Sequence, residues 1–156
     1  MKHYISAIVM GIAISTFSVA ASAQDSGAYI NVGIDTLNFE AYGIGGKVGY
    51  DLMDYVAVEV QGSVGVVDEK DTIGSITAKA GYDYIAGAFS VLKLPLSENF
   101  QPFVRTGYYF TELSASAAGQ SQSVSFDGFA VGGGAQFMWD SKNGIRAEYT
   151  LSLIHI

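Results

Sequence analysis

The side chains that most often carry enzyme chemistry are nearly absent from this sequence. Histidine occurs only as His3 and His155, close to the two ends, and there is no cysteine. The residues between them cannot assemble a Ser-His-Asp or Cys-His nucleophile, or a metal site built on His or Cys ligands. We therefore expect no catalytic residue, no cofactor and no metal, and a protein that is not an enzyme.

Two further patterns could be taken for ligand-binding motifs. Asp68, Glu69 and Asp71 crowd one polar segment and could bind Ca²⁺ weakly, but no complete loop of oxygen ligands surrounds them. Residues 132–134 are three consecutive glycines without the following helix and lysine of a phosphate-binding loop. A solvated acidic loop and a strand segment are the better interpretations.

The overall composition excludes some partners and favours a sheet. The formal net charge of −7 argues against nucleic acid, whose phosphates need a basic surface. Hydrophobic residues make up 49% of the chain and charged residues 15%, below the roughly 25% charged of an average soluble domain. No internal apolar run reaches the roughly 18 residues of a helical membrane span. The 19 glycines and 10 tyrosines favour strands with aromatic girdles over helices.

The first 23 residues have the three parts of a secretory signal peptide. Lys2 gives the positive start, residues 5–19 form the apolar stretch, and Ala21, Ser22 and Ala23 form a small-x-small cleavage site. We expect cleavage before Gln24. The alternative is an uncleaved membrane anchor, which the short apolar run and the cleavage pattern disfavour.

From Ala28 onward the hydrophobic pattern has a period of two, which predicts strands. Between Tyr55 and Gly65, for example, four valines fall on one face and polar or small residues on the other. The predicted strands cover residues 28–36, 41–50, 55–66, 77–92, 101–113 and 124–139, with another beginning at Ile145. Residues 51–54, 95–99 and 140–144 are tight turns, whereas residues 67–75 and 114–123 have the composition of longer loops. Short turns at one rim and longer loops at the other are typical of an outer-membrane barrel.

The charges on the clearest strands all share the face that carries small or polar residues. These residues are Lys47, Glu59, Arg105, Arg146 and Glu148. A charge on a lipid-facing surface costs about 2–4 kcal/mol at mid-membrane, so this face is expected to line the lumen, where the two glutamates pair with the three cations. A gate or narrow ion path is possible there, but a structural plug is favoured, because the interior of a small barrel is only wide enough for side chains.

Aromatic residues gather near the predicted strand ends, as expected of the two interfacial girdles of a membrane protein. The residues assigned to the lipid interface are Tyr42, Tyr50, Tyr55, Tyr108 and Trp139.

Together these segments resemble the OmpA/OmpX-like family of outer-membrane β-barrels, a group that includes opacity-type and porin-like surface proteins. The resemblance covers about residues 27–150. The segments on which it rests are residues 46–52, 55–59, 101–108 and 144–149. It implies an all-β fold, an antiparallel transmembrane up-and-down β-barrel of about eight strands. It also implies a lumen salt-bridge network at Glu59, Arg105 and Glu148.

The end of the chain departs from the family pattern. Only about seven strands can be counted from Ala28, whereas single-chain bacterial barrels have an even number. Residues 151–156, Leu-Ser-Leu-Ile-His-Ile, are also the translation of a transposase-based sequencing adapter. We expect a truncated chain with its last strand missing or replaced, although a natural continuation of the strand remains an alternative. The predicted organisation is a signal peptide at 1–23, a barrel at 24–150 and an adapter artefact at 151–156.

The sequence thus predicts a non-enzymatic surface protein of the bacterial outer membrane, with an envelope-structural or adhesive role. A small-solute porin is the alternative. Expected partners are outer-membrane lipid and lipopolysaccharide, the barrel-assembly machinery and periplasmic chaperones during biogenesis, and an unidentified host or environmental molecule. No nucleic acid partner is expected.

Overall fold

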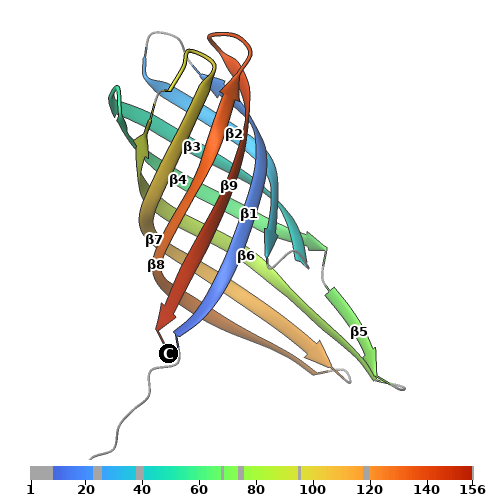
Figure 1. Cartoon of the computed structure of the whole chain (residues 1–156). Coiled ribbons are helices and arrows are strands. Elements are labelled where there is room, and N and C mark those ends of the chain that lie inside the picture. Colours follow the sequence, from blue (N-terminus) through green and yellow to red (C-terminus); the bar gives the residue numbers. More distant parts are fainter. Residues whose placement is uncertain are drawn as a thin grey trace, which may run out of the picture.

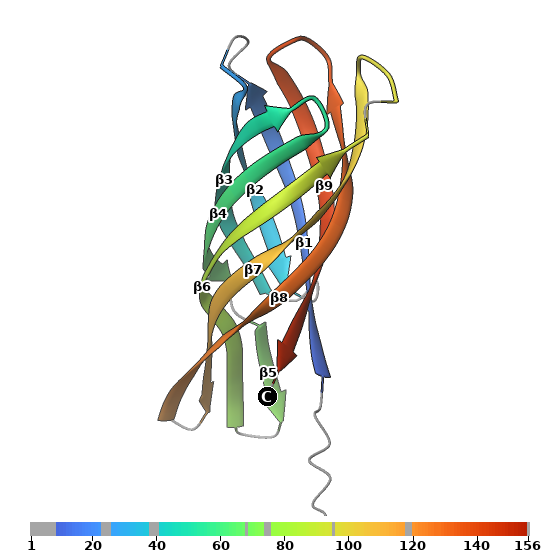
Figure 2. The same cartoon turned by 90° about the vertical axis from the view of Figure 1, so that its left-hand side faces the viewer.

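The chain forms a closed antiparallel β-barrel, seen from two directions in Figures 1 and 2. The structure is a computed structural model, and it describes residues 9–22, 26–37, 41–67, 69–73, 76–94, 96–117 and 120–155. The wall follows the order β4-β3-β2-β1-β9-β8-β7-β6 and closes by pairing of β4 with β6. Within the described ranges, the chain has no helix with the length and apolarity needed to span a membrane.

The strands have the following bounds: β1 Val9–Ser22, β2 Ala28–Leu37, β3 Ala41–Met53, β4 Val56–Val67, β5 Glu69–Ile73, β6 Ile76–Lys93, β7 Phe100–Ala117, β8 Gln120–Met138 and β9 Asn143–His155. Each predicted strand from Ala28 onward has a counterpart, usually one to four residues longer at its ends. The predicted tight turns connect β3 to β4, β6 to β7 and β8 to β9. The acidic segment divides differently: Glu69 and Asp71 belong to β5, and Asp68 lies outside the described residues.

The expectation that the last strand is missing is wrong. The wall has eight strands, the even number expected of such a barrel. The predicted count of seven begins at Ala28 and omits residues 9–22, which in the structure of the whole chain form β1, between β2 and β9. Whether the first 23 residues are cleaved, and whether residues 151–156 derive from an adapter, stay predictions.

Strand β9 continues without interruption through residues 151–155, which belong to the predicted adapter segment. Leu151 and Leu153 face outward and Ser152 faces the lumen, so the alternation of the strand continues. On its two sides, β9 pairs with β8 up to Ile154 and with β1 up to His155. Both edges of β9 are therefore hydrogen-bonded, as a strand within a membrane requires.

Two segments predicted as loops are largely strand. Residues 69–73 form β5, which pairs with β6, and residues 114–117 and 120–123 continue β7 and β8. Small side chains do not interrupt a backbone ladder, so pairing persists beyond the membrane-crossing part. Strands β6, β7 and β8 have 18, 18 and 19 residues, against the roughly 9–11 that a tilted strand needs to cross a bilayer. Figure 2 shows their ends projecting as long hairpins beside β5.

The two ends of the barrel differ in their connections. The tight turns gather at one end, the upper end in Figure 1, and we call it the turn end. The projecting hairpins lie at the opposite end, the loop end, together with the C-terminus and the start of β1. Near the loop end the lumen is packed by an apolar cluster, whose buried members are Ile14, Ala41, Ile85, Phe89, Tyr109 and Ala130.

Candidate functional site: the charged lumen and the apolar outer wall

The five charged residues singled out in the sequence all point into the lumen. They come from β3, β4, β7 and β9, and their side chains meet toward the turn end. None is more than 6% exposed, and Arg105 and Glu59 are 1% exposed. Each strand supplies them on its inward parity, because successive side chains of a strand point to opposite faces.

Glu148 is the centre of the network. Its Oε1 accepts hydrogen bonds from Lys47 Nζ and, at 2.6 Å, from Arg105 Nη1. Its Oε2 accepts a hydrogen bond from Arg146 Nε at 3.0 Å, and Arg146 Nη2 forms an ion pair with it at 2.9 Å. One carboxylate therefore contacts three cations from β3, β7 and its own strand.

Glu59 is the second anion, and Arg146 holds it in a two-point contact. Arg146 Nη1 donates to Oε1 at 2.5 Å and Nη2 donates to Oε2 at 3.0 Å. Arg105 Nη1 lies 3.7 Å from Oε2. Such paired contacts between guanidinium and carboxylate groups are the strong, orienting kind of charged hydrogen bond.

Aromatic rings extend the network on its apolar side. The Arg105 guanidinium stacks 3.6 Å from the centre of the Phe89 ring, and the Arg146 guanidinium stacks 3.9 Å from that of Phe103. Gly134 leaves room for Phe103, because a Cβ there would lie 2.8 Å from the end of the ring. Stacking of this kind favours a cation most when water is excluded.

Sequence reasoning missed several lumen residues. Tyr29 donates a hydrogen bond to Glu59 Oε1 at 2.7 Å, and Gln61 accepts one from Arg105. Lys93 pairs with Asp51 near the turn end. The alternation of Tyr29, Asn31 and Asp35 along their strand is a signal that places Tyr29 on the inward face. The strand that contains Lys93 has apolar residues on both faces, so its alternation does not predict which side chains point inward.

A further buried contact involves residues 9–22, which lie within the predicted signal peptide. Thr16 on β1 donates a hydrogen bond at 2.5 Å to Oδ1 of Asp35 on β2, and both residues are less than 9% exposed. Because residues 9–22 are predicted to belong to a signal peptide, the sequence prediction does not include this pair.

The charge and packing of the network suit a plug better than a reaction centre. Three cations face two carboxylates, which leaves a net charge of +1 on these five residues. Their side chains contact one another across the lumen, from β4 to β9 and from β3 to β9. Within the described residues, no group of three or more His, Cys, Asp or Glu side chains is placed to hold a metal ion.

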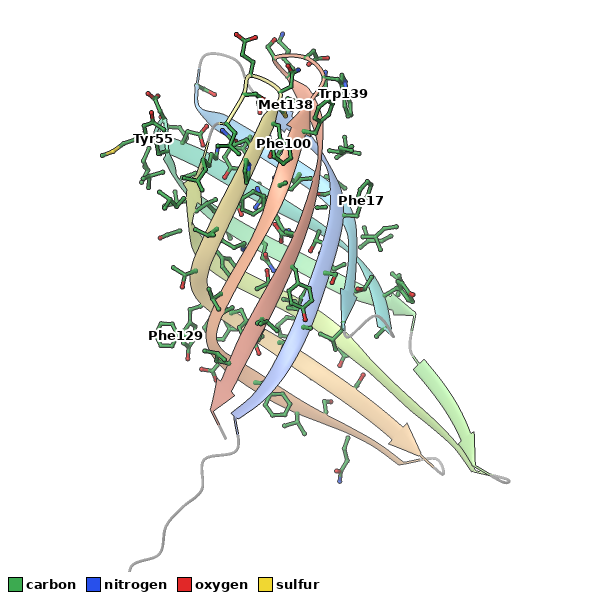
Figure 3. The ribbon with its side chains drawn as sticks, viewed as in Figure 1. Phe17, Tyr55, Phe100, Phe129, Met138 and Trp139 are labelled. Atoms are coloured by element: carbon green, nitrogen blue, oxygen red, sulfur yellow. The ribbon has the colours of Figure 1, made fainter. Side chains whose placement is uncertain are left out.

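The outer wall has the opposite character. Large apolar side chains stand exposed around the barrel, among them Val32, Ile44, Val60, Val104 and Leu151. Figure 3 shows Phe17 and Phe129 directed away from the barrel on different sides. A continuous apolar exterior around a charged interior is the arrangement of a barrel surrounded by lipid.

The five aromatic residues assigned to the lipid interface are all on the outer surface, at two levels. Tyr50, Tyr55 and Trp139 are exposed near the turn end, and Figure 3 shows Tyr55 and Trp139 beside that rim. Tyr42 and Tyr108 are exposed toward the loop end. The Tyr108 hydroxyl donates to Asp127, and its ring packs edge-to-face against Phe129 at 5.3 Å.

A family model described as "Outer membrane protein beta-barrel domain" matches residues 10–156, which include β1 and the end of β9. No curated protein matches the chain.

Solved structures that are similar share little sequence with this chain. The N-terminal beta-barrel domain of Pseudomonas aeruginosa OprF is 11% identical, with a TM-score of 0.49 and coverage of 92% of this chain and 96% of that chain. Ail, the attachment invasion locus protein of Yersinia pestis, is 15% identical, with a TM-score of 0.42 and coverage of 95% and 97%. Neisserial surface protein A is 11% identical, with a TM-score of 0.48 and coverage of 91% and 95%.

Proposed function

Because the chain belongs to the outer membrane protein beta-barrel domain family, we propose that it is a non-enzymatic surface protein of the outer membrane, with an adhesive or other binding role. The projecting hairpins carry this proposal. Their strands are much longer than the roughly 9–11 residues that a membrane crossing requires. In barrels of this kind the longer loops face outward.

Among the residues that the structure describes, the projecting part of β8 has a pairing partner on one edge only. Residues 120–127 pair with β7, whereas pairing of β8 with β9 begins only at Gly128. Among these residues Val124 is 52% exposed. An unpaired strand edge offers backbone N–H and C=O groups to an extended segment of another protein. A protein partner that adds a strand is therefore the chemistry we expect at the loop end.

The charged lumen favours this role over the alternative of a small-solute porin. Both carboxylates of the network are buried and hydrogen-bonded across the barrel, so a solute crossing this level would have to separate several ion pairs. We expect the folded full-length chain to give no stepwise conductance in a planar bilayer. Regular conductance steps from folded protein would favour the porin.

The binding role is tested by shortening the β7–β8 hairpin. Residues 115–122 are replaced by Asn-Gly, which joins the registered pair Ser114 and Ser123 by a two-residue turn. Bacteria displaying the full chain should adhere to an epithelial monolayer or to matrix-coated wells, and bacteria displaying the shortened chain should adhere several-fold less. A heat-modifiability gel checks that both chains fold. Equal adhesion by the two strains would overturn the proposal.

A further inference from the structure

The glycines of the barrel wall fall into two classes. A Cβ at inward Gly45 or Gly107 would overlap atoms of neighbouring strands, so packing inside the barrel excludes a side chain there. Outward Gly46 and Gly62 are different. The atom nearest to an added Cβ would be a carbonyl oxygen, 3.6 Å away at Gly46 and 4.0 Å away at Gly62. Within the described ranges, no neighbouring atom requires glycine at these two positions.

Glycine at these positions nevertheless weakens the sheet. A glycine in a strand interior has no side chain to pack. It often marks a bulge, a sharp bend or a place where a ligand or another backbone approaches closely. The register shifts between β3 and β4 lie elsewhere, at Tyr42/Gly43 and Asp51/Met53. A ligand or another backbone that approaches these glycines closely from outside the barrel therefore remains as the explanation for them.

The two outward glycines continue into a track of small residues across three strands. Gly46 pairs with Gly62, and Gly62 pairs with Ala86. Side chains larger than alanine border this track on both sides, except at Ala88. The border toward the loop end consists of Ile44, Val64 and Tyr84, and the border toward the turn end consists of Val48, Val60 and Ala88.

The track is the floor of a hollow in the outer wall, which we call the glycine groove. Its volume is about 510 Å³, and Val32 on β2 completes its lining at one end. Gly46 is equally far along β3 from Tyr42, toward the loop end, and from Tyr50, toward the turn end. At about 3.3 Å per residue, each girdle tyrosine is roughly 13 Å away along the strand. The glycine groove therefore lies near the centre of the bilayer.

We propose that the glycine groove binds one acyl chain of a membrane phospholipid. At this depth the medium consists of acyl chains, and the headgroups lie at the level of the aromatic girdles. The lining residues are glycine or apolar, apart from Ser63 and Tyr84. An unfilled hollow would forfeit dispersion contacts on every side, whereas a flexible, unbranched chain follows a narrow track and fills it.

A second copy of the protein fits the groove less well. Ten residues line it, whereas a stable protein interface uses roughly 20–30 residues on each side. Its narrow floor of glycine and alanine also suits a thin chain better than a rigid barrel wall.

Native mass spectrometry of the folded full-length chain in detergent, titrated with dipalmitoyl-phosphatidylethanolamine, tests the proposal. Wild-type protein should retain one lipid at low lipid concentration. The double variant Gly46→Val/Gly62→Val fills the groove with side chains that favour strands, and it should need at least fivefold more lipid for the same occupancy. Gly133→Val is the matched control, because Gly133 also faces outward but lies on β8, and it should bind as wild type does.

A second readout uses the same proteins in vesicles that contain a phosphatidylcholine spin-labelled on its acyl chain. The number of motionally restricted lipids per barrel should fall by about one in the double variant and stay constant in Gly133→Val. A heat-modifiability gel establishes folding, and Gly62→Ala replaces the double variant if that variant does not fold. Equal lipid retention by all proteins would overturn the proposal. So would a dimer that the double variant loses, because the occupant would then be a second copy.

Discussion

Two neighbouring residues of β3, Gly46 and Lys47, show how different the two surfaces of this barrel are. Lys47 points inward and pairs with Glu148 among other charges, in a lumen where most side chains are buried. Gly46 points outward onto an apolar hollow, where an added Cβ would meet a carbonyl oxygen no closer than 3.6 Å. One residue along the strand separates a crowded charged interior from an underfilled apolar exterior. The effect of a substitution therefore depends on which face of the wall the side chain occupies, as well as on its depth in the membrane.

The largest effect is expected from removing one charge inside the lumen. Glu148→Gln would leave Lys47, Arg105 and Arg146 with Glu59 as the only carboxylate of the network. Breaking a buried pair in this way costs about 3–5 kcal/mol, because charges remain buried without compensation. A urea titration of the folded chain in phospholipid vesicles measures the loss. Glu98→Gln, at an exposed turn position, is the control, and equal stability of the two variants would contradict the role assigned to the network.

The converse change, a charge placed on the outer wall, should have the next largest effect. Val60 is 64% exposed near the middle of the barrel, and Val60→Lys should lower the free energy of unfolding in vesicles by about 2–4 kcal/mol. Leu52→Lys, near the turn-end rim, should lower it by no more than about 1 kcal/mol. If both lysines had the same small effect, the outer wall would not be facing lipid.

A smaller effect distinguishes the two interpretations of residues 9–22. Thr16→Val removes the donor to Asp35 and leaves a buried carboxylate oxygen without that partner, which should cost about 1–3 kcal/mol in urea unfolding. Intact mass measurement of the purified barrel accompanies the titration. If the first 23 residues are cleaved, the mass falls accordingly and the substitution leaves the stability of the barrel unchanged.

The smallest effect concerns the turn between β8 and β9. Asp140 accepts hydrogen bonds from the Asn143 side chain and from the backbone N–H groups of Lys142 and Asn143, and these hold the pKa of its carboxyl below the usual range. The ionised carboxylate thus favours the folded state above its ordinary pKa of about 3.9, and this contribution disappears as the pH falls through the lower folded value. Asp140→Ala should be slightly less stable than wild type at neutral pH and equal to it in acid. A difference that persists unchanged in acid would mean that the charge is not responsible.

Most of the wall could be predicted from the sequence, because side-chain alternation is a local property. A period of two, fixed by backbone geometry, placed the valines of β4 outside and Glu59 inside before any strand was paired. The inward charges and the exposed aromatic residues follow from the same alternation. The scarcity of His and Cys likewise needs no structure to be seen.

Pairing between distant strands decided the rest. The position of β1, the contact of Thr16 with Asp35 and the alignment of Gly46, Gly62 and Ala86 all depend on which strands become neighbours and in what register. An apolar segment with small residues satisfies both a signal-peptide pattern and a strand pattern, and only closure of the wall gives it two hydrogen-bonded edges. Closure is a property of the whole cylinder, because an open edge leaves backbone groups without partners in lipid, and no local segment of sequence encodes it.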